Sequence, residues 1–144
     1  MLKKTITYTD YDGNTQTEDF YFNLTKAELA EMELSTEGGM ENMLKEVVDS
    51  KDNRRILEVF KDIVRRAYGV KTDDGKRFVK TESDWLAFTQ TEAYSELFME
   101  LIGNADAAAA FINGVVPKIE GEQQAQISMA KQKMLERHGD KNMQ

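Results

Sequence analysis

The residues of this chain that could do chemistry are few, and they lack the partners that catalysis needs. His138 is the single histidine among 144 residues, and it stands beside Gly139 in a polar stretch that would not orient it as a base or a ligand. Cysteine is absent, which removes thiol nucleophiles, disulfides and the strongest zinc ligands together. The sequence therefore predicts a protein that is not an enzyme and that binds no cofactor.

Two acidic turns resemble ion-binding segments only at first sight. Residues 10–14, DYDGN, begin like a calcium-binding loop, but the glycine is in the fourth position and Tyr21 occupies the twelfth, where such a loop needs a bidentate glutamate. Residues 73–76, DDGK, have no glycine-rich phosphate-binding loop beside them. Both segments are predicted to be β-turns, and no metal site is expected.

The overall charge argues against two classes of partner. The formal net charge is -7, so a nucleic acid would be repelled at long range. The N-terminus lacks the apolar core of a signal peptide, and no apolar run approaches the roughly 20 residues that span a membrane. We expect neither a nucleic-acid nor a membrane partner, and the absence of cysteine fits a reducing cytosol.

The elements that would position any functional surface begin with a predicted β-hairpin at residues 3–22. Its two arms are rich in Thr, Tyr, Ile and Phe, and they flank an Asp-Gly turn. Ile6 and Tyr8 share one face of the first arm. Because an isolated hairpin is marginally stable in water, we expect its aromatic end, with Phe20 and Phe22, to pack on helices.

Residues 25–117 are predicted to hold five or six helices. Thr25 and Glu28 have the spacing of a capping box. A second helix is expected at about residues 41–49. A longer one should run over residues 53–68, capped by Asp52 and followed by Gly69 at the C′ position.

The middle of the chain gives weaker signals. A second Asp-Gly turn lies within residues 70–81, which indicates either a small hairpin or an ordered loop. Ser83 then precedes a short helix that contains Trp85. A further amphipathic helix is expected to start after Thr91 and to close at Gly103.

The two helices within residues 91–117 are predicted to form a helical hairpin with an apolar face. Leu97, Phe98 and Leu101 belong to the stripe of the first helix, with Ala93 and Ile102 widening that stripe. They are interpreted as core, and a docking face for another protein is the alternative. The second helix is predicted to be capped by Asn104 and to end at Gly114 and Pro117. The small alanine side chains at residues 107–110 would allow close packing on one side of this helix.

Eight large apolar side chains are the candidate protein-contact residues. They are Phe20, Phe22, Trp85, Phe98, Phe111, Ile112, Val115 and Val116. The last four stand near the end of the helical hairpin and suit a subunit or client contact. Phe20 and Phe22 could instead pack over the helices within the same chain, and Trp85 could belong to the core or to an interface.

The predicted fold is α+β and mostly helical. We expect one globular domain over residues 1–117, with the hairpin at 3–22 and the helical part at 25–117. Residues 118–144 form a polar tail that could be helical, disordered, or ordered only on a partner.

Three stretches carry a resemblance to a known family. They are residues 20–39, FYFNLTKAELAEMELSTEGG; residues 68–80, YGVKTDDGKRFVK; and residues 88–117, FTQTEAYSELFMELIGNADAAAAFINGVVP. In this order the chain resembles the tail assembly chaperones of long-tailed, siphovirus-type bacteriophages and prophages of Gram-positive bacteria. The similarity is one of sequence pattern and includes no catalytic motif.

The resemblance implies a function and a set of partners. Such a protein would act in the host cytoplasm, bind the tape measure protein, keep it soluble and help the major tail tube protein to polymerise around it. It would be absent from the mature virion, and a longer, frameshifted form of the chain could accompany it. Many copies along the tape measure protein would associate head to tail as a ring or spiral.

The charge also supports a hypothesis of a different class. A small acidic adaptor or inhibitor could occupy a basic surface of a host protein. Its binding should weaken steeply with salt, whereas binding through an apolar surface should persist.

Overall fold

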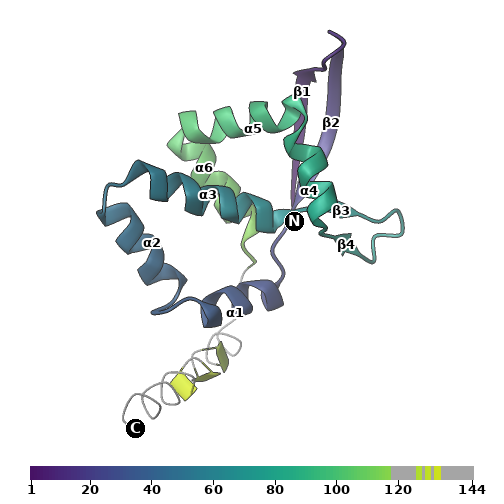
Figure 1. Ribbon diagram of the computed structural model, residues 1–144. Coiled ribbons are helices and arrows are strands. Elements are labelled where there is room, and N and C mark those ends of the chain that lie inside the picture. The colour runs from purple at the N-terminus through teal and green to yellow at the C-terminus, as the bar shows by residue number, and fades with distance from the viewer. Residues whose placement is uncertain (118–125, 128, 131, 134–144) are drawn as a thin grey trace. The chain divides into compact units, whose positions relative to one another are not determined.

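The computed structural model describes residues 1–117, 126–127, 129–130 and 132–133 of the chain (Figure 1). Its strands are β1 (Leu2–Thr9), β2 (Thr15–Phe22), β3 (Tyr68–Lys71) and β4 (Phe78–Val79). Its helices are α1 (Lys26–Ser35), α2 (Met40–Asp49), α3 (Asn53–Ala67), α4 (Glu82–Thr89), α5 (Glu92–Gly103) and α6 (Ala105–Val115). The predicted fold class, α+β and mostly helical with an N-terminal hairpin, is confirmed. Most of the predicted tail, 118–144, lies outside the described residues.

The chain divides into two compact units. The first combines Met1–Leu24 with Leu57–Val116, and it holds the whole sheet, α4 to α6 and most of α3. The second combines Thr25–Ile56 with Pro117–Gln144 and holds α1 and α2. That residues 1–117 form one domain stays a prediction.

The first unit is built on an antiparallel sheet with the strand order β1-β2-β3-β4. The β1 and β2 strands pair along their full length, from Leu2 opposite Phe22 to Thr9 opposite Thr15. The first two residues of β3 pair with the last two residues of β2, so that Tyr68 lies opposite Phe22 and Gly69 opposite Tyr21. The sequence left it open whether residues 70–81 form a hairpin or a loop. In the structure these residues belong to the β3–β4 hairpin, which surrounds the predicted Asp-Gly turn.

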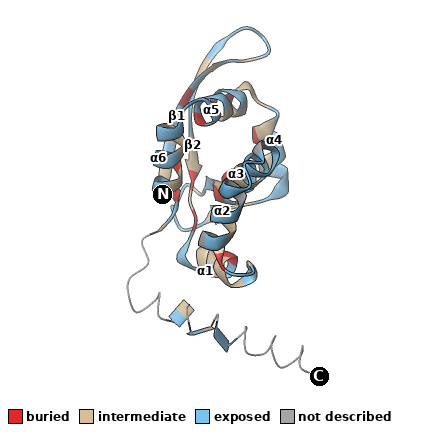
Figure 2. Cartoon of the chain, turned by 90° about the vertical axis from the view of Figure 1, so that its left-hand side faces the viewer, coloured by how far each residue is buried: buried red, intermediate tan, exposed pale blue. Residues whose placement is uncertain are grey.

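One face of this sheet forms the core of the first unit. Burial alternates along β1, so that Ile6 is buried and its neighbours are exposed. The ring of Phe22 is fully buried and lies 5.1 Å from the ring of Phe111 in α6 and 6.0 Å from that of Phe88 in α4, measured between centroids. Figure 2 shows buried residues on β2 and on the helices of this unit. The predicted packing of the aromatic end of the hairpin on helices is confirmed.

Two glycines that were predicted to mark the ends of helices have other roles in the structure. Gly69 does not follow α3 at a C′ position, because the helix ends at Ala67 and Gly69 lies in β3. A Cβ atom there would stand 2.6 Å from the Phe78 ring, so the close approach of this ring favours glycine. Gly114 does not end α6, which continues to Val115; a Cβ at Gly114 would lie 3.0 Å from Leu2 of β1.

Most predicted helix starts are confirmed by their hydrogen bonds. The capping box of Thr25 and Glu28 is complete at the start of α1. The Asp52 carboxylate accepts from the backbone N–H of Arg54 at the start of α3. The Asn104 side chain accepts from two backbone N–H groups at the start of α6. Each bond satisfies a donor that the first turn of a helix leaves unpaired.

Two predicted caps differ in detail. Ser83 was predicted to precede α4, but Thr81 caps this helix: its hydroxyl accepts from the backbone N–H of Asp84 at 3.1 Å, so Ser83 is already helical. Thr91 stands at the N-cap position of α5, but its hydroxyl donates to the Phe88 carbonyl at the end of α4 instead. This bond closes the joint between α4 and α5.

A lysine ties three chain segments of the first unit together. The Nζ of Lys80 donates to the carbonyl of Asn23, after β2, and to that of Arg66, in the last turn of α3, both at 2.7 Å. A positive charge is favourable there because the last carbonyls of a helix carry partial negative charge. The bonds fix the ends of β2 and α3 beside the β4 strand.

Candidate protein-interaction surfaces

The eight predicted contact residues all lie in the first unit, and burial separates them. Phe22, Phe111 and Val115 belong to the core, each with 2% or less of its surface exposed. Phe20, Trp85, Phe98 and Ile112 are half-buried, and Val116 is exposed. Whether any of them contacts another protein stays a prediction, and only the half-buried and exposed members offer surface in this conformation. Leu97 and Leu101 are buried, which confirms their interpretation as core.

The half-buried aromatic side chains are the outer members of a continuous ring cluster. Its centre is Phe88, which stacks on Tyr68 with centroids 4.5 Å apart and planes 11° apart. Trp85 and Tyr94 meet edge to face at 5.7 Å, and Tyr94 leads on to Phe98 at 5.9 Å. Burial disfavours the charged form of the Tyr68 and Tyr94 hydroxyls and raises the pKa of each above its ordinary value. Trp85 and Phe98 thus support the core and also present surface.

Three further apolar side chains on α4 and α5 are exposed, and the sequence did not single them out as contact residues. Leu86 of α4 is 50% exposed, and Met99 and Ile102 of α5 are 61% and 51% exposed. Met99 and Ile102 are three residues apart, so they adjoin on one face of the helix. Ile102 was expected to widen the buried stripe of α5, and this expectation is wrong; Ala93, its other predicted extension, is fully buried.

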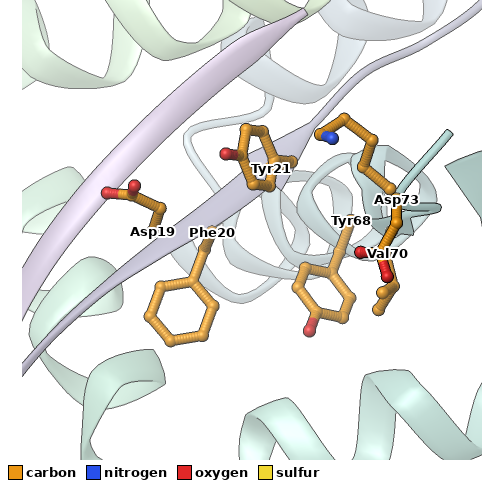
Figure 3. Close-up of a pocket in the computed structure, with 8 residues that line it drawn as sticks. Asp19, Phe20, Tyr21, Tyr68, Val70 and Asp73 are labelled. Carbon is orange, nitrogen blue, oxygen red and sulfur yellow. The ribbon is translucent and has the colours of Figure 1, made fainter. Parts of the chain in front are cut away.

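A pocket lies where β3 separates from β2 (Figure 3). Its volume is about 390 Å³. The close-up shows the rings of Phe20 and Tyr68 pointing the same way, with Asp19 on one side of them and Asp73 on the other. Its lining consists of Asp19, Phe20, Tyr21, Tyr68, Gly69, Val70, Lys71 and Asp73. These groups suit an apolar side chain next to a polar or charged one.

Beyond the pocket, the outer half of the β1–β2 hairpin projects past the helices of the first unit (Figures 1 and 2). Polar side chains link its strands. The Thr5 hydroxyl donates to the Asp19 carboxylate at 2.6 Å, and the hydroxyls of Thr7 and Thr17 lie 3.0 Å apart. Tyr8 donates to the Glu18 carboxylate, and this bond raises the pKa of Tyr8 to about 12.

The turn of this hairpin is organised by Asp10. Its carboxylate accepts from the side chain of Gln16 at 2.8 Å and from the backbone N–H groups of Asn14 and Asp12. The bond from Gln16, followed by the backbone bonds, lowers the pKa of Asp10. DYDGN is thus a β-turn, as predicted, with Gly13 at a φ of 85°.

The described residues offer little for other kinds of site. They contain no group of three or more His, Cys, Asp or Glu side chains that could hold a metal ion. None of the helices within them has the length and apolar character that a membrane crossing requires. His138 lies outside the described residues.

Comparison with known proteins gives a match along the chain. The family model described as "Phage tail assembly chaperone" matches residues 1–143. No curated protein and no solved structure matches the chain. The match therefore extends beyond residues 1–117 into the C-terminal region.

Proposed function

The chain belongs to the phage tail assembly chaperone family, and we propose that it binds the tape measure protein, keeps it soluble and promotes polymerisation of the tail tube protein around it. The observation that carries this proposal is the family match over residues 1–143. Members of this family are chaperones without enzymatic activity, so function must rest on accessible surface.

The exposed apolar side chains of α4 to α6 support the proposal. Met99, Ile102 and Leu86 each keep half or more of their surface in contact with water. Val116 follows α6 and is 37% exposed. A chaperone for a long helical client needs accessible apolar groups that can pack against the apolar faces of that client. We assign the contact to these residues together with the accessible parts of Trp85, Phe98 and Ile112.

The remaining partners follow from the same role. The major tail tube protein would meet the complex as it polymerises, and a longer, frameshifted form of the chain could share the site. Association of many copies as a ring or spiral would cover an extended client. The proposed setting is the host cytoplasm, with a siphovirus-type phage or prophage of a Gram-positive bacterium as the source, and the chain would not remain in the mature virion.

Co-expression tests the client. The tape measure protein encoded beside this chain should be insoluble alone and should become soluble and co-purify when the two are made together. Because the contact is apolar, the complex should persist when the salt concentration is raised from about 0.1 M to 1 M, where charge interactions are screened. A folded chain that leaves the tape measure protein insoluble would refute the proposal, and loss of the complex in high salt would favour the acidic adaptor.

A double variant tests whether the exposed apolar side chains of α5 contact the client. Met99→Glu with Ile102→Glu places two charges at exposed positions, so the chain should still fold while capture of the tape measure protein falls by about tenfold or more. The matched control is Ala27→Glu with Ser35→Glu on α1, a helix outside the proposed contact, which adds the same charge at exposed positions and removes no large apolar side chain. Equal capture by both variants would show that α5 is not the contact.

A further inference from the structure

The hairpin β1–β2 has two open edges. β1 is the end strand of the sheet, and among the described residues it pairs only with β2. β2 is covered by β3 only at its last two residues, Tyr21 and Phe22, so the edge of residues 15–20 is open as well. Such rows of unpaired backbone groups are templates for pairing with another strand.

The register shows which residues present their backbone groups at these edges. The backbone N–H of Asp10 donates to the carbonyl of Asn14 at 2.8 Å, in the same register as the strands. Hydrogen-bonded pairs alternate with non-bonded pairs in an antiparallel ladder, so even-numbered residues bond within the hairpin and odd-numbered residues direct N–H and C=O outwards. The outward residues are Lys3, Thr5, Thr7 and Thr9 on β1, and Thr15, Thr17 and Asp19 on the open part of β2. All of them are exposed.

The two edges are complementary in charge. The β1 edge carries the exposed Lys3, and the β2 edge carries the exposed Asp19. If β1 of one copy pairs antiparallel with β2 of another so that Lys3 lies opposite Asp19, then Thr5 lies opposite Thr17 and Thr7 opposite Thr15. Each of these pairs joins two outward-directed residues, as an antiparallel ladder requires. Opposite charges and paired threonines both stabilise neighbouring strands.

This register also leaves the existing sheet intact. The outward groups of Tyr21 face Gly69, so an added strand must leave the β2 edge at Asp19. The added strand reaches Lys3 at that point, so the proposed ladder ends where β3 begins to pair with β2.

We propose that copies of this chain associate by strand addition, with β1 of one copy on the open edge of β2 of the next and with Lys3 against Asp19. The two surfaces differ, so the contact is head to tail and continues along a ring or spiral. This inference specifies the self-association within the proposed function; it does not depend on which client is bound.

Charge reversal tests the register. In Lys3→Glu the new carboxylate faces Asp19, and in Asp19→Lys the new ammonium faces Lys3, so each variant alone should associate about tenfold more weakly than the unmodified chain, as measured by sedimentation equilibrium at about 0.15 M salt. Mixing the two variants restores an opposite-charge pair at every contact. We expect the mixture to recover association to within about threefold of the unmodified chain.

The control is Lys76→Glu, which makes the same charge change at an exposed residue of the β3–β4 turn, away from both edges, and which should associate like the unmodified chain. Circular dichroism melts should show that each variant is folded. An unmodified chain that stays monomeric up to about 1 mM, no loss in either charge variant, or no recovery in the mixture would each overturn the inference. Solubilisation of the tape measure protein by such a chain would leave the proposed function standing.

Discussion

The two ends of the β1–β2 hairpin share one ladder but are stabilised differently. At the base, residues 2–6 and 18–22, alternate side chains such as Ile6 and Phe22 are buried against the helices of the first unit. At the tip, residues 7–17, the strands are joined by side-chain hydrogen bonds between exposed groups such as Thr7 and Thr17. Burial of a large ring contributes several kcal/mol, whereas an exposed hydrogen bond contributes about 0.5 to 1.5 kcal/mol. The base thus belongs to the core, and the tip can change without unfolding it.

The largest effect should come from the base. Phe22→Ala removes a fully buried ring that contacts Tyr68, Phe88 and Phe111, so it should lower the free energy of unfolding by about 3 to 5 kcal/mol in urea titrations. Thr17→Ala at the tip removes one exposed hydrogen bond and should cost about 1 kcal/mol or less. Similar losses in the two variants would contradict the division between base and tip.

A smaller effect is expected where β3 meets the base. Gly69→Ala places a Cβ atom 2.6 Å from the Phe78 ring, and relieving that overlap should cost about 1 to 3 kcal/mol of stability in the same titration. Gly103→Ala is the matched control, since its Cβ meets nothing within 4 Å and it lies at the end of a helix. Alanine there should be neutral or stabilising by up to about 1 kcal/mol. Equal destabilisation by the two variants would show that the Phe78 contact is not what favours glycine at position 69.

The sequence predicted those features that depend on neighbours along the chain. The capping box at Thr25, the cap at Asn104 and the Asp-Gly turn after Asp10 each involve residues within five positions of one another, so their spacing is visible in the sequence. The same local signals gave the number and order of most helices. The family resemblance drawn from three stretches was confirmed by the match over residues 1–143, whereas the host group stays a prediction.

Features that depend on distant residues were missed. Gly69 looked like a helix end, because only the folded sheet brings Phe78 against it. Ile102 fits the apolar period of α5, but the stripe that meets the sheet leaves it on the outer side with 51% exposure. Phe111 stands near a Gly and a Pro that suggested a surface segment, yet α6 packs closely on β1 through Gly114 and buries it. Which face of a helix is covered is a tertiary property, and no local pattern sets it.

A local effect is expected at the turn of the tip. Asp10→Ala leaves the backbone N–H groups of Asp12 and Asn14 and the side chain of Gln16 without their acceptor. Amide hydrogen exchange should accelerate in residues 7–17 and stay unchanged at the base and in α5, because the tip makes no contribution to the core. Asp12→Ala, two residues further along the same turn, is the control. Faster exchange throughout the first unit would mean that tip and base unfold together.

The smallest effect concerns the ionisation of Tyr8. Its hydrogen bond to Glu18 raises its pKa from 10.0 to about 12 in the folded chain, so the folded state holds this proton to higher pH than the unfolded state does. The stabilisation is complete below pH 10.0 and is lost as the pH rises towards about 12, because the unfolded state ionises first. Urea titrations across this window should show the stability advantage of the unmodified chain over Tyr8→Phe shrinking with pH. Comparison with this variant cancels the titration of Tyr68 and Tyr94, whose pKa values are also raised. A constant difference between the two chains would show that the tip does not hold the Tyr8 proton in solution.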